Sequence, residues 1–365
     1  MKFVNKYLRN LQPYKVASHK IWEVGYSEQS KVLKLDWNEA TIPPSPNVKK
    51  ALLELVNHEN IFNLYPSTFN SQLLGLLSNY TGLSENNLQY FASSDSLHEY
   101  LVRMYVAAGD PILILGPTYD NFRLTCESQG GHVNYFYYEP DFNLDEKGFI
   151  NKILEVKPSL IYLCNPNNPS GNLISEKFIL NILSIFKDTV VLVDEAYFEF
   201  AKFSMSNYVN KFENLFITRT FSKAFALANF RAGYLISHPT NISEVSKIRN
   251  SKNFGTFTQV AVIAALSDIN YMQSYVEEVL KAKIQFCENL TALNFVNRYF
   301  ESTANFVLVK FEDKHFKELV ISKLEENYIY VRDLQHSVLL ENCLRFTIGT
   351  SKQMAMVIRL LKSIS

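Results

Sequence analysis

Short apolar runs alternate with amphipathic stretches along residues 60–265 of this 365-residue chain. The runs are rich in β-branched residues and stop at polar or turn-forming residues, whereas the stretches between them repeat apolar residues at helical spacing. This alternation is typical of an α/β domain with a mostly parallel sheet. The strands that it predicts are 111–115, 132–138, 159–164, 189–194, 214–219 and 232–237.

The helices predicted by the same pattern lie between these strands and beyond them. One helix is expected to begin near Ser94, a second to cover 177–186, and a continuous helical pattern over 257–293 predicts one long helix. The C-terminal part predicts a smaller α+β unit, with strands at 305–311, 328–334 and 343–350, a helix around 313–326 and a closing amphipathic helix.

Length and charge favour a two-domain protein that binds small molecules. We expect a large α/β domain over 56–265 and a small α+β domain formed by 1–55 together with 266–365, with a ligand cleft between them. The chain carries 36 Lys and Arg against 36 Asp and Glu. This balance offers no electrostatic footprint for nucleic acid or for an anionic membrane surface.

The four cysteines are far apart and none is in a Cys-x-x-Cys pair. Their spacing suggests neither a metal site nor a disulfide framework, and reduced thiols are the default for such a chain. The N-terminal stretch has frequent charges and no export signal, and no apolar run is long enough to span a membrane. We therefore expect a cytoplasmic protein.

Glycine is scarce, with 12 residues in 365, or about 3% against the usual share of roughly 7%. No two glycines stand at Gly-x-Gly spacing, and there is no P-loop pattern. The usual dinucleotide and nucleotide fingerprints are therefore absent. If this protein binds a phosphate group, it does so without a glycine-rich loop.

Polar or aromatic residues follow four of the predicted strands. They are Tyr119 in Gly-Pro-Thr-Tyr, the Asn-Pro turns over 165–171, Asp194, and Ser222 with Lys223. Each has an ordinary structural explanation: a helix cap for Asp194, a solvated surface side chain for Lys223, and a plain turn for the Asn-Pro repeats. However, the carboxyl ends of parallel strands meet at one edge, where ligands bind, so together these residues predict a site.

These residues also resemble the motifs of fold-type-I pyridoxal-phosphate aminotransferases. The matching motifs are YP (65–66), SSD (93–95), GPTY (116–119), NPNNPSG (165–171), DEAY (194–197), RTFSKAF (219–225) and NFRAGY (229–234). The histidinol-phosphate aminotransferases are the most similar branch, through LRNLQPY (8–14), LDWNEATIPPSP (35–46), ANFVLV (304–309), YVRDL (330–334) and LRFTIGT (344–350). The resemblance implies a seven-stranded type of large-domain sheet, a homodimer and pyridoxal 5'-phosphate as cofactor.

The resemblance further implies a role for each cofactor-site residue. Lys223 would bind the cofactor covalently and then move the proton, and Asp194 would keep the pyridine nitrogen protonated. Asn168 and Tyr197 would hydrogen-bond the phenolic oxygen, and Tyr119 would stack on the ring. The cofactor phosphate would be bound by the helix N-terminus at Ser94 and Asp95, by Thr220, Ser222 and Arg231, and by Tyr65 from the partner subunit.

The substrates implied by the resemblance are glutamate or 2-oxoglutarate and a phosphorylated ketone or amine. Arg345 would bind the α-carboxylate of the donor, and Arg345, Arg332 and Tyr14 would bind the phosphate of the second substrate. Asn38 would lie in the N-terminal stretch that folds over the site. The second substrate would be imidazole-acetol phosphate, or a smaller ketone such as dihydroxyacetone phosphate, with serinol phosphate as the product amine. Decarboxylation of an O-phospho amino acid, phosphothreonine or phosphoserine, is the alternative reaction.

The chain departs from the family pattern where the cofactor phosphate would bind. The family usually has Gly-Asn-Gly-Ser-Asp-Glu there, whereas residues 91–96 are Phe-Ala-Ser-Ser-Asp-Ser. We expect Ser93 and Ser94 to keep ordinary backbone angles, because positive φ is costly without glycine. Asn229 replaces another family glycine, and we expect it to be compatible because asparagine tolerates left-handed geometry. These substitutions at the mouth of the site favour the smaller ketone over the imidazole substrate.

Overall fold

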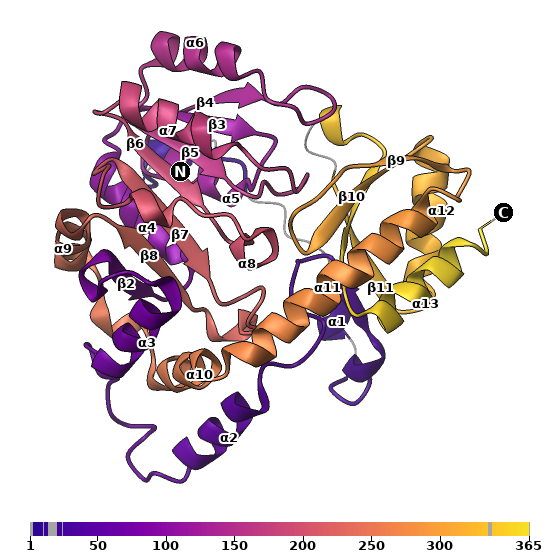
Figure 1. The fold of residues 1–365 in the computed structure, drawn as a ribbon, viewed down its shortest axis with the longest axis horizontal. Coiled ribbons are helices and arrows are strands. Elements are labelled where there is room, and N and C mark those ends of the chain that lie inside the picture. Colours follow the sequence, from indigo (N-terminus) through magenta and orange to yellow (C-terminus); the bar gives the residue numbers. More distant parts are fainter. Residues whose placement is uncertain (1–2, 10, 14–19, 24, 335–337, 365) are drawn as a thin grey trace.

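The computed structural model describes residues 3–9, 11–13, 20–23, 25–334 and 338–364 and contains two β-sheets (Figure 1). Tyr14 lies outside the described residues. The large sheet has seven strands in the order β2-β8-β7-β6-β5-β3-β4. Its strands are β2 (Leu88–Phe91), β3 (Pro111–Gly116), β4 (His132–Tyr137), β5 (Leu160–Cys164), β6 (Val190–Asp194), β7 (Leu215–Thr220) and β8 (Gly233–Ser237).

The large sheet confirms the predicted α/β class. β4, β3, β5, β6 and β7 are parallel, and only β8 pairs in the antiparallel direction, with β7 and with β2. All six strands predicted from the pattern are present, with ends that differ by at most one residue. The pattern did not predict β2, which has four residues and includes the polar Gln89.

Helices cover both faces of this sheet. Alternate residues of the central strands enter two separate cores: Ile161 and Val191 pack with α3, α6 and α7, whereas Tyr162 and Leu192 pack with α4, α5 and α9. This burial on both faces explains why the strands are wholly apolar. The helices of this part are α3 (Ser71–Thr81), α4 (Ser94–Tyr105), α5 (Asn121–Ser128), α6 (Glu146–Val156), α7 (Glu176–Ile185), α8 (Phe198–Ala201), α9 (Pro239–Ile248) and α10 (Thr256–Leu266).

The second sheet has five strands in the order β1-β11-β12-β10-β9, drawn in indigo, orange and yellow in Figure 1. Because β1 pairs with β11, the N-terminal segment lies in the same sheet as the C-terminal strands. The division at residues 56 and 265 stays a prediction. The elements are β1 (Leu33–Leu35), β9 (Val296–Tyr299), β10 (Phe306–Phe311), β11 (Ile329–Asp333), β12 (Cys343–Thr347), α1 (Lys20–Glu23), α2 (Pro46–Leu55), α11 (Ile269–Leu290), α12 (Lys314–Glu325) and α13 (Ser351–Leu361).

The prediction of one long helix over 257–293 is wrong. The structure has two helices, α10 and α11, separated by Ser267 and Asp268. Asp268 leaves helical geometry, with φ −133° and ψ 54°, and its carboxylate accepts hydrogen bonds from Ser45 and Asn47. The break lets α10 pack against α2 and α3 while α11 packs against α13.

Within the described ranges, none of the helices is both long and apolar enough to cross a membrane. The four cysteines are free thiols, and three of them are buried. The cytoplasmic location stays a prediction.

Gly171 lies where the Asn-Pro turn meets the loop before β10. Its φ is +81°, and a Cβ there would lie 2.0 Å from the Ser302 Oγ and 2.8 Å from the Ser302 Cα. Its carbonyl oxygen accepts hydrogen bonds from the backbone and the hydroxyl of Thr303. This turn therefore needs glycine both for its backbone angle and for its close approach.

We expect Gly171→Ala to lower the free energy of unfolding by at least about 2 kcal/mol, because a strained φ and a backbone clash add together. Gly82→Ala is the matched control, since Gly82 has φ +71° with nothing within 4 Å of the added carbon. The control should cost only about 1 kcal/mol. Urea unfolding of both variants measures the difference, and equal losses would contradict the packing argument.

Candidate active site

A cavity of about 1110 Å³ lies where the carboxyl ends of β5, β6 and β7 face the second sheet. It brings together most of the residues predicted from the sequence. Those that line it are Asn38, Ser94, Asp95, Tyr119, Asn168, Asp194, Tyr197, Thr220, Ser222, Lys223, Arg231, Arg332 and Arg345.

Tyr65 is the one described candidate that does not line this cavity. Its side chain is 79% exposed, and the Lys252 ammonium lies 4.5 Å from the centre of its ring. Within a single chain, therefore, Tyr65 is not part of the site.

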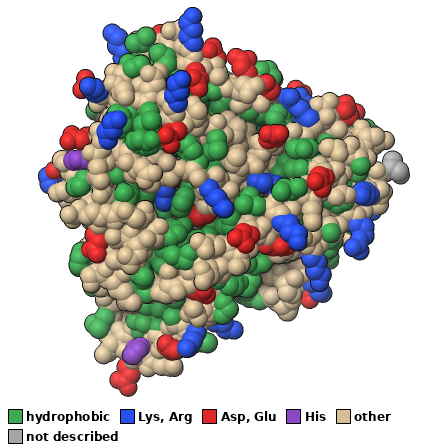
Figure 2. Space-filling model, in the orientation of Figure 1, with side chains coloured by type: hydrophobic (Ala, Val, Ile, Leu, Met, Phe, Trp, Pro, Cys, Tyr) green, Lys and Arg blue, Asp and Glu red, His purple; other side chains and the backbone are tan. Residues whose placement is uncertain are grey.

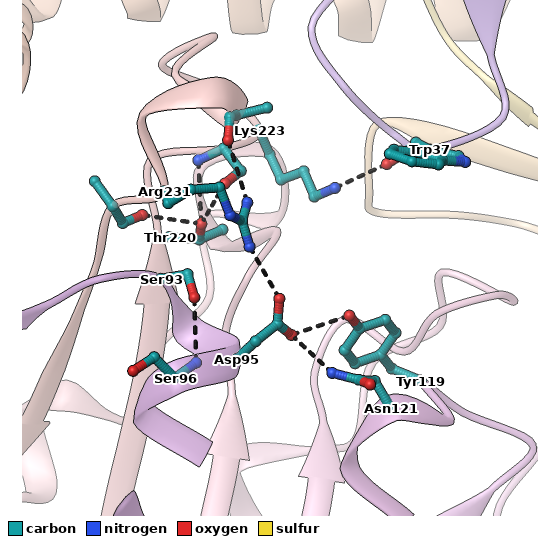
Figure 3. Close-up of polar contacts among 12 residues, drawn as sticks. Trp37, Ser93, Asp95, Ser96, Tyr119, Asn121, Thr220, Lys223 and Arg231 are labelled. Carbon is teal, nitrogen blue, oxygen red and sulfur yellow. Dashed lines mark hydrogen bonds and ion pairs between the residues drawn. The ribbon is translucent and has the colours of Figure 1, made fainter. Parts of the chain in front are cut away.

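Lys223 follows β7 and points into the cavity, where its Nζ donates to the backbone oxygen of Trp37 at 2.8 Å (Figure 3). The pKa of Lys223 is lowered to about 8, mainly because the amine is buried; Glu39 acts in the opposite direction, and Arg345 contributes to the lowering. A lysine amine with this pKa is partly unprotonated near neutral pH. It can therefore act as a nucleophile or a base.

Asp194 ends β6 and is 4% exposed. The Tyr162 hydroxyl donates to its Oδ2 at 2.8 Å, and the Thr218 hydroxyl donates to its Oδ1 at 3.2 Å. The register of the parallel strands sets Thr218 level with Asp194, which explains the second contact. Both carboxylate oxygens are thus held by donors, and the group is suited to facing a cationic ligand atom.

Tyr197 and Asn38 meet at the cavity, although they are 159 residues apart in the chain. The Asn38 Nδ2 donates to the Tyr197 hydroxyl oxygen at 3.0 Å, while the Asn38 Oδ1 accepts from the Thr347 hydroxyl. Burial raises the pKa of Tyr197 above its ordinary value. The phenol therefore keeps its own hydrogen and can donate it to a ligand.

Arg345, on β12, is 6% exposed and joins three parts of the molecule. Its Nη1 donates to the Asn168 Oδ1 and its Nη2 to the backbone oxygen of Asp36, each at 2.5 Å. Arg332, on β11, is its direct partner in the antiparallel register, so both guanidinium groups come from adjacent strands to the same cavity.

The start of α4 forms the opposite end of the cavity. Asp95 accepts hydrogen bonds from the Tyr119 hydroxyl at 3.0 Å and from the Arg231 Nη2 at 3.0 Å (Figure 3). The Thr220 hydroxyl donates to the Ser222 Oγ at 3.0 Å nearby. A helix N-terminus, two hydroxyls and an arginine together make an anion-binding end.

The expectation of ordinary backbone angles at Ser93 is wrong. Ser93 has φ 87° and ψ 159°, a region almost confined to glycine, while its Oγ accepts from the Ser96 backbone N–H and caps α4. The cause is tight packing behind the turn, since a Cβ on Gly233 would lie 2.7 Å from the Ser94 backbone nitrogen. Asn229 does not have a positive φ. The residue with left-handed geometry in this segment is Arg231, with φ 49°.

Several residues that support the site are not predicted from the sequence. His98, Tyr162 and Thr218 surround Asp194, and their only signal was a polar group inside an apolar pattern. At the mouth, Lys34 lies between Asp36 and Glu39, at 2.9 Å and 2.6 Å, with its Nζ 3.9 Å from the Trp37 ring centre. Local spacing could not predict the contacts around Asp194, because they depend on how distant elements pack, whereas those of Lys34 join residues at most five positions apart.

We expect Ser93→Gly to stabilise the protein by about 1 kcal/mol. The substitution relieves a strained backbone that costs about 1–3 kcal/mol, whereas replacing a serine cap by glycine costs only a few tenths. Ser175 caps α7 with an ordinary φ of −65°, so Ser175→Gly should destabilise the protein. Thermal and urea unfolding of both variants test the difference in sign, and destabilisation by Ser93→Gly would refute the strain.

We expect an amine-reactive reagent to label Lys223 in the ligand-free protein with a pH midpoint near 8, because burial favours the neutral amine. The labelling rate should rise with pH through this value and then level off. In the urea-unfolded chain the same lysine should show a midpoint at about pH 10.4. Mass spectrometry of the peptide that contains Lys223 measures both, and identical midpoints would contradict the effect of burial.

Comparison with known proteins agrees with this geometry. The family model described as aminotransferase class I and II matches residues 30–361. The chain is 41% identical to a dihydroxyacetone phosphate transaminase of Campylobacter jejuni, over 97% of this chain and 95% of the relative. It is 32% identical to a histidinol-phosphate aminotransferase of Ruminiclostridium cellulolyticum, over 95% and 92% of the two chains.

A solved structure has the same fold. The histidinol-phosphate aminotransferase of Sinorhizobium meliloti, in complex with pyridoxal-5'-phosphate, superposes with a TM-score of 0.87 at 22% identity, over 100% of this chain and 99% of that one. The resemblance inferred from the motifs is thus confirmed. This chain belongs to the class I and II aminotransferases and is a pyridoxal-phosphate-dependent enzyme of fold type I.

Proposed function

We propose that this enzyme transfers an amino group between glutamate or 2-oxoglutarate and a small phosphorylated ketone, with dihydroxyacetone phosphate as the preferred acceptor and serinol phosphate as the amine formed from it. The observation that carries the proposal is the pair of arginines, Arg332 and Arg345, which adjacent strands bring to the cavity that also contains Lys223. A carboxylate and a phosphate are both recognised well by arginine. The similarity to a dihydroxyacetone phosphate transaminase favours the three-carbon ketone.

The donor set of the cavity fits pyridoxal phosphate. The anion-binding end at α4, with Thr220, Ser222 and Arg231, would hold the phosphate, and Asp194 would face the ring nitrogen. The Tyr119 ring would pack against the cofactor ring. When bound, the cofactor supplies an aldehyde that reacts with amines and a ring that withdraws electrons from the substrate carbon.

The remaining residues would position groups and move protons. Asp194, held by two donors, would keep a proton on the ring nitrogen. Tyr197 and the Nδ2 of Asn168 would donate to the phenolic oxygen. Lys223 would hold the cofactor covalently until substrate arrives, and its neutral amine would then carry the proton to and from the substrate carbon.

Substrate binding would use the arginine pair. Arg345 would bind the α-carboxylate of glutamate through two parallel N–H groups, which a lysine could not offer. Arg332 and Arg345 would bind the phosphate of the ketone in the second half-reaction, with Tyr14 as a further predicted contact outside the described residues. Asn38 would hold Tyr197 in place and cover the site from the N-terminal side.

A panel of acceptors tests this proposal. With glutamate as donor, formation of 2-oxoglutarate should proceed with a higher kcat/KM for dihydroxyacetone phosphate than for imidazole-acetol phosphate, and Lys223→Ala should be inactive. A strong preference for imidazole-acetol phosphate would overturn the choice of acceptor. Release of carbon dioxide from phosphothreonine or phosphoserine, without 2-oxoglutarate, would show a decarboxylase instead.

We also propose that the enzyme is a homodimer in which Tyr65 contacts the cofactor phosphate bound by the other subunit. The support is an exposed apolar segment around it: Figure 2 shows hydrophobic side chains gathered where Figure 1 places α2 and α10. The exposed large apolar residues of this part are Leu53, Val56, Phe62, Leu64, Tyr65 and Phe69. Contiguous exposed apolar residues of this kind mark protein interfaces.

Mixing two inactive variants tests the shared site. If Tyr65 serves the other subunit, dimers that combine Tyr65→Ala with Lys223→Ala contain one intact site, so random re-association should recover about a quarter of the wild-type sites. Activity after mixing and subunit exchange, compared with each variant alone, measures this recovery. A strictly monomeric active enzyme, or no recovery after proven exchange, would contradict the proposal.

A further inference from the structure

His98 is the fifth residue of α4 and is 1% exposed. Its Nε2 is 3.1 Å from the Thr218 Oγ1 and 3.8 Å from the Asp194 Oδ2. The other ring nitrogen, Nδ1, is buried and has no hydrogen-bond partner among the described residues. Burying a ring nitrogen without a hydrogen-bond partner costs folding free energy. A histidine at this position therefore calls for a role for its other nitrogen, Nε2.

The aromatic surroundings fix the direction of this ring. The Phe122 ring meets it edge to face with centroids 5.4 Å apart, and the Tyr162 ring does so at 5.8 Å. Phe122 and Tyr162 also stack on each other at 4.1 Å. His98 is therefore held with Nε2 directed at Thr218, while the hydroxyl of Tyr162 donates to Asp194.

The direction of the hydrogen bonds follows from counting hydrogens. The Thr218 hydroxyl has one hydrogen, which it donates to the Asp194 Oδ1. The Thr218 oxygen can then only accept from His98, so the His98 Nε2 carries a hydrogen, whether the ring is neutral or protonated. The result is a chain of donors from His98 through Thr218 to the carboxylate.

We infer that His98 is a positioning residue for Asp194: by donating to Thr218, it directs the threonine hydroxyl onto the Asp194 Oδ1 and so strengthens the hold of Asp194 on the cofactor ring nitrogen. This inference rests on the proposed role of Asp194. Hydrogen bonds in a buried chain polarise one another, so loss of the first donor weakens the contact made by the second. Without His98 the threonine hydroxyl loses its fixed orientation.

The dissociation constant of pyridoxal phosphate, measured by equilibrium dialysis of the holoenzyme, tests this chain. His98→Leu removes the donor, whereas His98→Gln places an amide N–H near the position of Nε2. We expect His98→Leu to weaken cofactor binding about 3- to 10-fold and His98→Gln to stay within about twofold of the wild type. Equal losses in both variants, or no loss in His98→Leu, would overturn the inference.

A double-mutant cycle separates positioning from packing. Thr218→Val should weaken binding as His98→Leu does, and the double variant should be no weaker than the weaker single variant, because both break one chain. Independent, multiplicative losses would overturn the coupling. Asp194→Asn separates a failure of the proposed function from a failure of this inference. If Asp194→Asn leaves cofactor binding unchanged, the proposed role of Asp194 is wrong. If Asp194→Asn weakens cofactor binding but the His98 variants bind normally, only the role inferred for His98 is wrong.

A measurement on the unmodified holoenzyme keeps the test independent of variant folding. In protein labelled with ¹⁵N-histidine, the His98 Nε2 resonance, assigned by its loss in His98→Gln, should show a directly bonded hydrogen. A His98 Nε2 without hydrogen would mean that the threonine donates to the histidine instead of to Asp194, and the inference would be wrong.

Discussion

The assembled site depends on the hydrogen bonds made by the buried guanidinium of Arg345. It starts on β12 and reaches both the Asn168 side chain after β5 and the backbone oxygen of Asp36 after β1. A guanidinium removed from water must be matched by acceptors, so these segments hold one another in place. The same contacts position the backbone after Asp36, where Trp37 accepts from Lys223 and Asn38 donates to Tyr197. The N-terminal segment is thus a wall of the site.

The sequence predicted the large sheet and its chemistry because both depend on local pattern. The apolar strands β5 and β6 end in Cys164 and Asp194, which the parallel register makes level, and β7 ends at Thr220, two residues beyond the partner of Asp194 and shortly before Lys223. It did not predict the break between α10 and α11, because Asp268 is stabilised there by Ser45, far away in the chain. Contacts such as the one between Trp37 and Lys223 depend in the same way on tertiary packing, which no spacing along the chain encodes.

The turn before α4 shows how tertiary packing can override a residue's own preference. Gly233 allows β8 to approach the Ser94 backbone closely, and Ser93 adopts a positive φ at this turn without being a glycine. The strain is confined to one residue, whose hydroxyl also caps the helix. A glycine-poor chain can therefore keep an anion-binding helix end, since the geometry comes from the neighbouring strand and not from a flexible loop.

The charged side chains of the cavity limit the kinds of ligand that can bind there. Lys34 is paired with Asp36 and Glu39, and Arg231 with Asp95, so the charges of two of the cations are offset by neighbouring carboxylates. Arg332 and Arg345 lie level on adjacent strands. On the proposed function, glutamate and the phosphorylated ketone would use this same arginine pair in turn. Two arginines on adjacent strands suit anionic groups such as a carboxylate and a phosphate, which is the chemistry that these two substrates share.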